Sequence, residues 1–289
     1  MKLASRRLDE LTSREVEFWM KEGGDLALIP FGPSSGHGAL ISLGIHAHWA
    51  HALAMLIAER ANGLVYPPIY TVYSGATRTF RGAVSFSITE QVEILTRLAK
   101  KLYAQGFKRT VLVAGTTPEN YGGMVAARQL FDETEVPFWM IEGERLLHLP
   151  EVKAIYEGYP GNFGETLIGL ASLKILGRER PIPCPAWSKE LKGDDGEGDQ
   201  PREITKDVNT LRGFGAMGWR YHEEKNHGNH GTAGIEWKGR SDIDMTVGVL
   251  EKCADMVVPA MKNLQHYQAW LEKHPQRFIE ATDRLEEPL

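Results

Sequence analysis

The chain has 289 residues, of which 42% are hydrophobic and 25% are charged, and its formal net charge is -5 at pH 7. These values are ordinary for a globular protein with a sizeable core. The mild negative charge argues against nucleic acid as a partner, because phosphate binding requires a concentrated basic face and none is visible.

No apolar run approaches the ~20 residues of a membrane span, so no membrane partner is expected. The N-terminal residues include Arg6 and Arg7 but no apolar stretch behind them, which does not fit a signal peptide. Only two cysteines occur, Cys184 and Cys253, and they are far apart in the sequence. We therefore expect no disulfide framework and a cytoplasmic location.

Apolar runs of strand length alternate with segments of helical periodicity up to about residue 180. Strands are predicted at residues 26–31, 69–73, 110–114 and 136–141, and helices at residues 46–61, 89–105 and from 123 to 131. Strands separated by helices of this length imply parallel βαβ units. The predicted fold class is α/β, a three-layer α/β/α sandwich with a mostly parallel central sheet.

The second half of the chain is less regular. Residues 188–204 are charged and rich in glycine, which is typical of a solvated surface insertion. Residues 244–273 show the pattern of one long amphipathic C-terminal helix, with Pro259 as its candidate break. No stretch reads as an interdomain linker, and a single domain spanning residues 1–289 is predicted.

Polar residues with the chemistry of metal ligands follow two of the predicted strands. His37 comes after the first strand, Glu119 after the strand at 110–114, and His46 opens the first long helix. The carboxyl ends of parallel strands meet at one edge of a sheet. Two imidazoles and one carboxylate are a common ligand set for catalytic zinc or manganese. The alternative is that these are unrelated polar residues in loops.

The order and spacing of four segments resemble the creatininase (creatinine amidohydrolase) family. Residues 32–46 resemble its first motif, a Gly-Ser-x-Glu-x-His-Gly-x-His-Leu-Pro loop that ends on an aspartate. Residues 113–120 can be placed beside its Asn-Gly-His-x-x-Asn motif, and residues 159–166 beside its His-Ala-Gly-x-x-Glu-Thr-Ser motif. Residues 80–83 resemble its Phe-Pro-Gly-Thr segment. The resemblance covers roughly residues 26–175 and implies the creatininase-like fold.

The metal site implied by the resemblance differs from that of the family. Those enzymes bind two metals bridged by an aspartate, and this position is His46 here. Ser35, and Thr117 or Thr116, stand where the family has further ligands. The resemblance therefore implies one divalent ion per chain, Zn or Mn, held by the two histidines and the glutamate named above.

Proton-transferring groups are predicted from the third motif and from a histidine-rich segment. Glu165 and Thr166 match the family's Glu-Thr pair. Glu165 is either a general base or simply a first-turn glutamate that the helix dipole favours. Tyr159 or Pro160 replaces the family's histidine. Residues 221–231 suit a loop that closes over a polar substrate, or else an exposed polar loop. The predicted catalytic residues are Glu165, His230, His227 and Tyr159.

Substrate contacts are expected from the same loops. Arg78 and Arg81 suit a carboxylate or a polyol, although such arginines also form surface ion pairs. The predicted substrate-binding residues are Arg78, Arg81, Ser35, Thr117 and Asn120.

The resemblance implies a hydrolase that opens a small polar ring at a carbonyl carbon. The substrate is expected to be a cyclic amide, or a keto-inositol such as a diketo-inositol, whose carbon–carbon bond is cleaved. The alternative from another class is a non-catalytic relative that binds a metabolite or a subunit partner through a decayed metal site. The resemblance also implies a homo-oligomer, a hexamer as in relatives.

Overall fold

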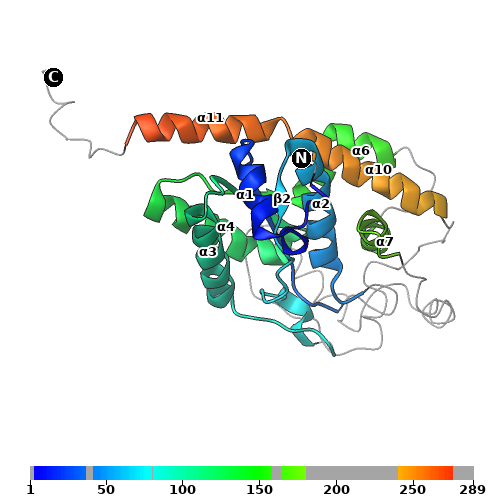
Figure 1. Ribbon diagram of the computed structural model, residues 1–289. Helices are drawn as coiled ribbons and strands as arrows, with labels where there is room; N and C mark the ends of the chain where they lie inside the picture. The colour runs from blue at the N-terminus through cyan, green and yellow to red at the C-terminus, as the bar shows by residue number, and fades with distance from the viewer. Residues whose placement is uncertain (1–2, 37–41, 80, 158–163, 180–239, 276–289) are drawn as a thin grey trace, which may run out of the picture.

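A computed structural model describes residues 3–36, 42–79, 81–157, 164–179 and 240–275 (Figure 1). Several predicted features lie outside these described residues: the insertion at 188–204, the segment at 221–231, His37, Tyr159, His227 and His230. Within the described part of the chain, no helix is both long and apolar enough to cross a membrane.

In the described ranges, four parallel strands form the sheet, in the spatial order β2-β1-β3-β4. The strands are β1 (Leu26–Phe31), β2 (Leu64–Val65), β3 (Arg109–Ala114) and β4 (Trp139–Glu142). Phe31 lies opposite Ala114, and Ala114 lies opposite Glu142. The carboxyl ends of β1, β3 and β4 therefore come level at one edge of the sheet.

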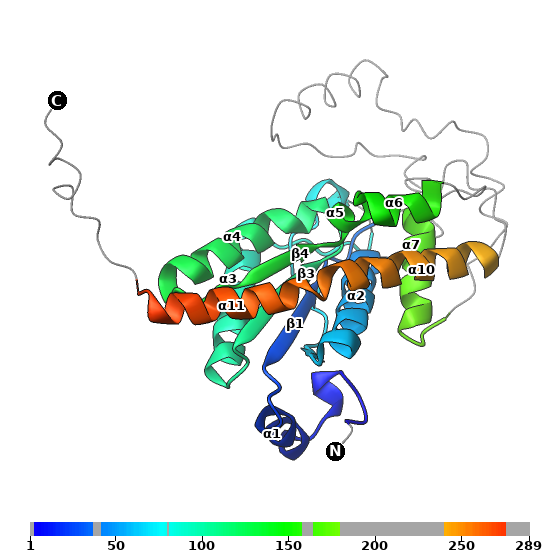
Figure 2. The same cartoon turned by 90° about the horizontal axis from the view of Figure 1, so that it is seen from above.

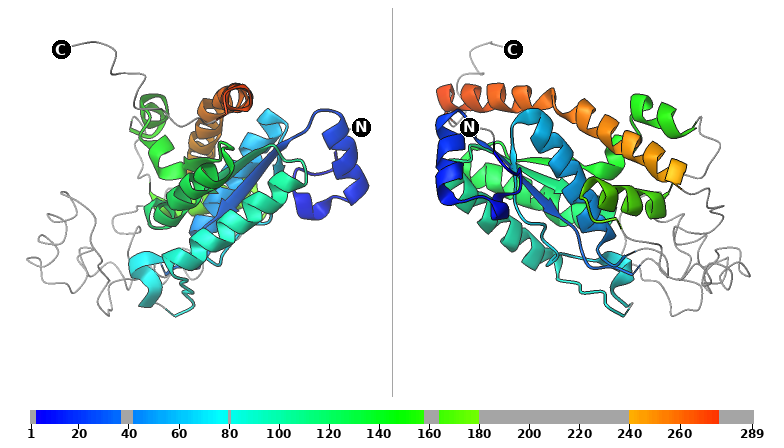
Figure 3. Two further views of the ribbon diagram at one scale, coloured as in Figure 1. Left: turned by 90° about the vertical axis from the view of Figure 1, so that its left-hand side faces the viewer. Right: turned by 45° about the vertical axis from the view of Figure 1, so that its right-hand side comes forward.

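Helices cover both faces of this sheet, which confirms the predicted three-layer α/β/α fold (Figures 1 and 3). One layer contains α2 (Ile45–Ala61), α5 (Gly143–Leu147), α6 (Pro150–Glu157), α7 (Glu165–Ile175) and α10 (Arg240–Val257). The other contains α3 (Ile88–Ala104) and α4 (Thr117–Thr134), with α1 (Ser13–Lys21) joining through Trp19. Two short 3-10 helices are η1 (Leu8–Glu10) and η2 (Gly75–Thr79).

The apolar runs of the strands follow from burial on both faces. Leu26 and Leu28 of β1 join the core under α2, whereas Ala27, Ile29 and Phe31 join the core under α3 and α4. Successive side chains of a strand point to opposite faces, so a strand covered on both sides is apolar throughout. This pattern is why residues 26–31 are predicted as a strand with the observed bounds.

The strand predicted at residues 69–73 is wrong. Ile69 makes only one parallel bridge, to Phe31, and the second strand is instead the short β2. Pro67 and Pro68 lie between β2 and Ile69. Proline has no N–H to donate to a strand ladder, so the pairing that begins at β2 stops there.

The predicted C-terminal helix is two helices, α10 and α11 (Ala260–Lys273), separated at Val258 and Pro259. The first begins at Arg240, ahead of the predicted start. Figure 2 shows the two running nearly end to end across the molecule. Only α10 packs along its length on α2, α6 and α7, whereas Met261 is the one fully buried residue of α11.

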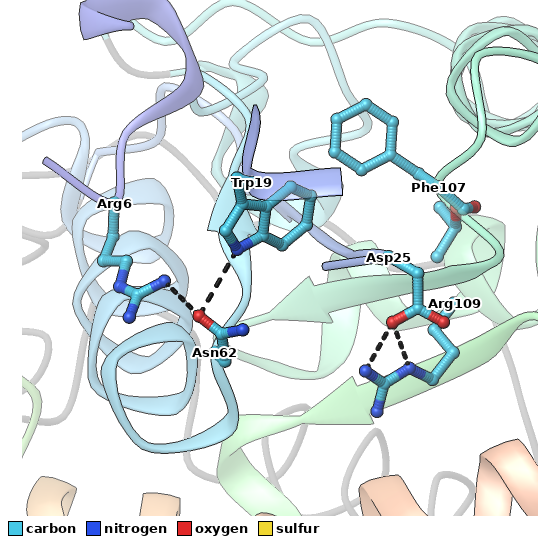
Figure 4. Close-up of polar contacts among 7 residues, drawn as sticks. Arg6, Trp19, Asp25, Asn62, Phe107 and Arg109 are labelled. Atoms are coloured by element: carbon cyan, nitrogen blue, oxygen red, sulfur yellow. Dashed lines mark hydrogen bonds and ion pairs between the residues drawn. The ribbon is translucent and has the colours of Figure 1, made fainter. Parts of the chain in front are cut away.

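Polar contacts hold together the amino-terminal edge of the sheet (Figure 4). Asn62 ends α2 in the left-handed conformation, with φ of 53°. Its side-chain oxygen accepts hydrogen bonds from Nη1 of Arg6 at 2.7 Å and from Nε1 of Trp19 at 3.3 Å. Asp25, just before β1, pairs with Nε of Arg109 at 2.8 Å. These contacts join α1, α2, β1 and β3 at the edge opposite the strands' carboxyl ends.

Candidate active site

The first turn of α2 lies directly on the carboxyl edge of the sheet. A glycine follows each of the three main strands, and each makes a close backbone approach: Gly32, Gly115 and Gly143. A Cβ on Gly32 would lie 2.5 Å from the backbone nitrogen of Ala47. A Cβ on Gly115 would lie 3.0 Å from the carbonyl oxygen of His46. The absence of side chains at these glycines therefore brings α2 onto the strand ends.

His46 is the histidine that this arrangement places at the edge. Its side chain is buried, with 3% of the residue exposed, and its Nδ1 lies 3.2 Å from Oγ1 of Thr116. Thr116 stands just after β3 and, with Thr117, is one of the two positions where the family resemblance puts a lost metal ligand. Its hydroxyl instead contacts the imidazole. A hydrogen bond at one ring nitrogen fixes which nitrogen faces away, and it thereby orients the ring.

The described residues on either side of residues 37–41 are held by hydrogen bonds. The backbone N–H of Ser35 donates to the carbonyl of Leu43 at 2.8 Å, and Ser35 is fully buried. Ser34 donates from its hydroxyl to the carbonyl of Gly82 at 2.8 Å. The residues that follow β1 are therefore hydrogen-bonded to the residues that precede α2, and Ser35 makes this contact.

Thr117, Glu119 and Asn120 lie on a helix, not on the loop that the sequence predicts. The helix α4 begins at Thr117, ahead of the predicted start at residue 123. Gly122 and Gly123 weaken the helical pattern of this segment, but both allow close packing. A Cβ on Gly122 would lie 2.6 Å from the Gln91 side chain, and one on Gly123 would lie 2.7 Å from Phe31.

Asn120 is buried and faces a carboxylate that sequence reasoning missed. Its Nδ2 donates to Oε2 of Glu142 at 2.7 Å, and Glu142 ends β4. The predicted strand at 136–141 stops one residue short of this glutamate. A carboxylate at the end of a parallel strand was the available signal.

The remaining predicted residues are spread more widely. Glu165 is the first residue of α7 and is half-buried, and the adjacent Thr166 is buried. Arg78, in η2, and Arg81 are exposed.

The imidazole of His46 is the proposed metal ligand whose side chain the structure describes. In the described ranges, no three His, Cys, Asp or Glu side chains gather closely enough to hold an ion. His37 lies outside those ranges and the structure describes only the backbone of Glu119, so the predicted three-ligand set stays a prediction. His46 contributes a buried imidazole that is already oriented by Thr116, as metal-binding histidines are by a second partner.

Two further histidines of α2 are buried. His48 contacts the Ser42 hydroxyl through Nδ1 at 3.3 Å and meets the Tyr70 ring edge-on. Burial, together with the guanidinium groups of Arg7 and Arg178, lowers the pKa of His51 to about 4. His51 is therefore neutral at physiological pH.

Comparison with known proteins shows which family the chain matches. The creatininase family, described as creatinine amidohydrolase, matches residues 9–164. A search of curated protein sequences finds no match.

Several solved structures share the fold at low identity. One is creatininase with Mn, 19% identical, with a TM-score of 0.55, covering 94% of this chain and 100% of that one. A glutamate-to-glutamine mutant of creatininase complexed with creatine is 17% identical, with a TM-score of 0.54 and coverages of 90% and 99%. A putative creatinine amidohydrolase from Bacteroides fragilis is 16% identical, with a TM-score of 0.59 and coverages of 97% and 100%.

The family match spans more than half of the chain, including β1, α2, β3, β4 and the edge occupied by His46 and Thr116. The chain therefore belongs to the creatininase (creatinine amidohydrolase) family.

Proposed function

We propose that this chain is a metal-dependent hydrolase that opens a small polar ring at a carbonyl carbon. The observation that carries the proposal is the placement of His46. It is buried on the first turn of α2, against the ends of β1 and β3, and is oriented by Thr116. A buried, hydrogen-bonded imidazole at the carboxyl edge of a parallel sheet suits a functional site better than a core position.

We propose that His37, His46 and Glu119 hold one divalent ion, Zn or Mn. When bound, such an ion lowers the pKa of a water molecule and polarises a substrate carbonyl. The related creatininase structure with Mn supports this choice of metal. His46 would bind through Nε2, because its Nδ1 faces the Thr116 hydroxyl.

Side chains of this protein would then transfer the protons and bind the substrate. Water adds to the ring carbonyl carbon, the ring bond to that carbon breaks, and the departing atom takes a proton. In a cyclic amide the departing atom is nitrogen. In a β-diketone ring it is carbon, which leaves as an enolate. We propose Glu165 as the proton acceptor, and Tyr159, His227 or His230 as the donor.

The substrate is proposed to be a cyclic amide, which the related structure complexed with creatine supports. A keto-inositol is the second candidate, because one metal suffices to cleave a β-dicarbonyl. Ser35, Thr117, Asn120, Arg78 and Arg81 are the proposed substrate contacts. We also propose a homo-oligomer, a hexamer by family resemblance.

A turnover panel tests the proposal. The full chain, stripped with chelator and then reloaded with Mn²⁺ or Zn²⁺, is assayed on creatinine, other cyclic amides and a diketo-inositol. We expect ring opening of at least one class, lost with chelator and restored with metal. Turnover of no compound by the reloaded chain would favour the non-catalytic alternative. Turnover that is insensitive to chelator would contradict the proposal that hydrolysis depends on a bound metal ion.

A further inference from the structure

Glu142 occupies the carboxyl edge of the sheet but has no part in the proposed ligand set. It is the last residue of β4 and lies opposite Ala114, the last residue of β3. Its side chain is only 14% exposed. The turn after it is fixed to β3, because the N–H of Glu144 donates to the carbonyl of Gly115 at 2.9 Å. Glu142 is therefore held on the same edge as Thr116.

Both carboxylate oxygens of Glu142 are engaged. Oε2 accepts the hydrogen bond from Nδ2 of Asn120 at 2.7 Å, and Oε1 pairs with Nε of Arg145 at 2.9 Å. The side chain of Arg145 is 73% exposed, so the cluster runs from the solvent to a buried amide. This arrangement holds the carboxylate in one orientation.

The carboxylate determines how the amide of Asn120 is turned. An ionised carboxylate only accepts hydrogen bonds, so it faces the NH₂ group of the amide and not its carbonyl oxygen. The carbonyl oxygen Oδ1 must then point elsewhere. Asn120 is 3% exposed, and Oδ1 is buried with no hydrogen-bond partner among the described residues. A buried acceptor of this kind costs free energy that a donor on a ligand would recover.

We propose that Glu142 is a positioning residue that turns Asn120 into a fixed hydrogen-bond acceptor for an N–H or O–H group of the substrate. The identity of that ligand rests on the proposed function, whereas the orientation of the amide does not. Arg145 holds Glu142, Glu142 holds Asn120, and Asn120 contacts the ring. The device selects substrates that carry a donor beside the scissile carbonyl.

A Glu142→Gln variant separates this role from a merely structural one. A glutamine side chain can donate as well as accept, so it permits both orientations of the Asn120 amide. On the panel substrate that the native chain hydrolyses, we expect KM to rise about 10-fold with kcat within about 2-fold. The matched control is Glu93→Gln, which removes a carboxylate paired with Arg97 on the surface of α3 and should change neither.

Non-additivity shows whether Glu142 acts through Asn120. In an Asn120→Ala background, Glu142→Gln should have no further effect on KM, and additive losses would overturn the proposal. N-methylation of a cyclic amide substrate should cost the native chain about 10-fold in kcat/KM and Asn120→Ala nothing. If the panel instead identifies an inositol substrate, the matching probe is its O-methyl ether.

An NMR experiment tests the positioning without any turnover. In the full chain labelled with ¹⁵N only at asparagine, we expect the side-chain NH₂ protons of Asn120 to be protected from solvent exchange. Their resonance is assigned by its loss in Asn120→Ala. Glu142→Gln should remove that protection, and Glu93→Gln should not. Unchanged protection in Glu142→Gln would overturn the proposal even if the enzyme is active. Lost protection supports it even if no panel compound is hydrolysed.

Discussion

The contact between Thr116 and His46 joins β3 to α2 through two side chains, and it predicts the behaviour of a single-atom change. Thr116→Val keeps the shape but removes the hydroxyl that orients the imidazole. We expect a 10- to 100-fold loss of kcat/KM and of metal affinity, the usual cost of removing a partner of a metal-binding histidine.

Thr110→Val is the matched control for that change. Thr110 lies at the other end of β3, is also buried, and donates to the carbonyl of Phe107 at 3.1 Å. Both variants should lose about 1 kcal/mol of stability, as measured by urea unfolding. Only the Thr116 variant should lose activity, and equal losses of activity would contradict the role given to Thr116.

His51 predicts a pH dependence of folding. Its pKa is lowered to about 4 in the folded chain. Between pH 6.5 and 4, His51 is therefore protonated in the unfolded chain but neutral in the folded chain. Stability should therefore fall as the pH falls through this window, by up to about 3 kcal/mol, and level off below it.

A leucine at this position should remove the His51 contribution. In urea unfolding at several pH values, His51→Leu should flatten the slope between pH 6.5 and 4. It should not weaken the fold at pH 7, because both ring nitrogens of His51 are buried without hydrogen-bond partners in the described residues. The exposed His266 of α11 is the control, and His266→Leu should leave the slope as it is.

Residue identity alone predicted His46 but not Glu142. His46 stands out because a histidine at the start of a helix follows a buried strand and a glycine-rich loop. Glu142 reads as an ordinary acidic residue between a short strand and a helix. Its role depends on Asn120, which is 22 positions away, and on Ala114 opposite it in the sheet. Such pairings arise only when strands come into register.

At the scale of elements, the approach of α2 to the strand ends depends on glycine. Gly32→Ala would place a methyl group 2.5 Å from the backbone nitrogen of Ala47, so the first turn of α2 must shift. We expect a loss of about 1–3 kcal/mol of stability and at least 10-fold of activity. Gly248→Ala in α10, where nothing lies within 4 Å, should instead gain up to about 1 kcal/mol and keep full activity.

The end of α2 makes a second prediction at this scale. Asn62→Ala loses both the left-handed preference and the bonds to Arg6 and Trp19, whereas Asn62→Gly loses only the bonds. Thermal unfolding should rank native above Gly above Ala, with about 2 kcal/mol between the extremes. Activity should be unchanged, because this edge lies opposite the candidate site. An alanine variant as stable as the glycine variant would contradict the role given to φ.

Elements with a long apolar pattern were predicted well, and those set by local exceptions were not. The bounds of β1 were predicted because both of its faces are buried. The strand expected at 69–73 failed because the two prolines before it stop the ladder after β2. The start of α4 was placed too late, because Gly122 and Gly123 look like loop residues although their packing against Gln91 and Phe31 requires glycine.

For the whole molecule, the alternation of strands and helices was enough to predict the α/β layers, since parallel strands need covering helices on both faces. The same pattern could not show that α11 extends beyond the core with Tyr267 and Trp270 exposed and stacked. Whether a helix face is buried depends on how the neighbouring elements pack, and the periodicity of the helix's own sequence does not predict this.

Metal content tests the central claim, a single-metal hydrolase site around His46, most directly. The full chain is loaded with Mn²⁺ or Zn²⁺, dialysed, and analysed for metal per chain by mass spectrometry, beside His46→Ala and His37→Ala variants that are checked for folding by circular dichroism. The account predicts about one ion per native chain and less than a tenth of that in each folded variant. Two ions per native chain, or an unchanged ion in the folded variants, would contradict it.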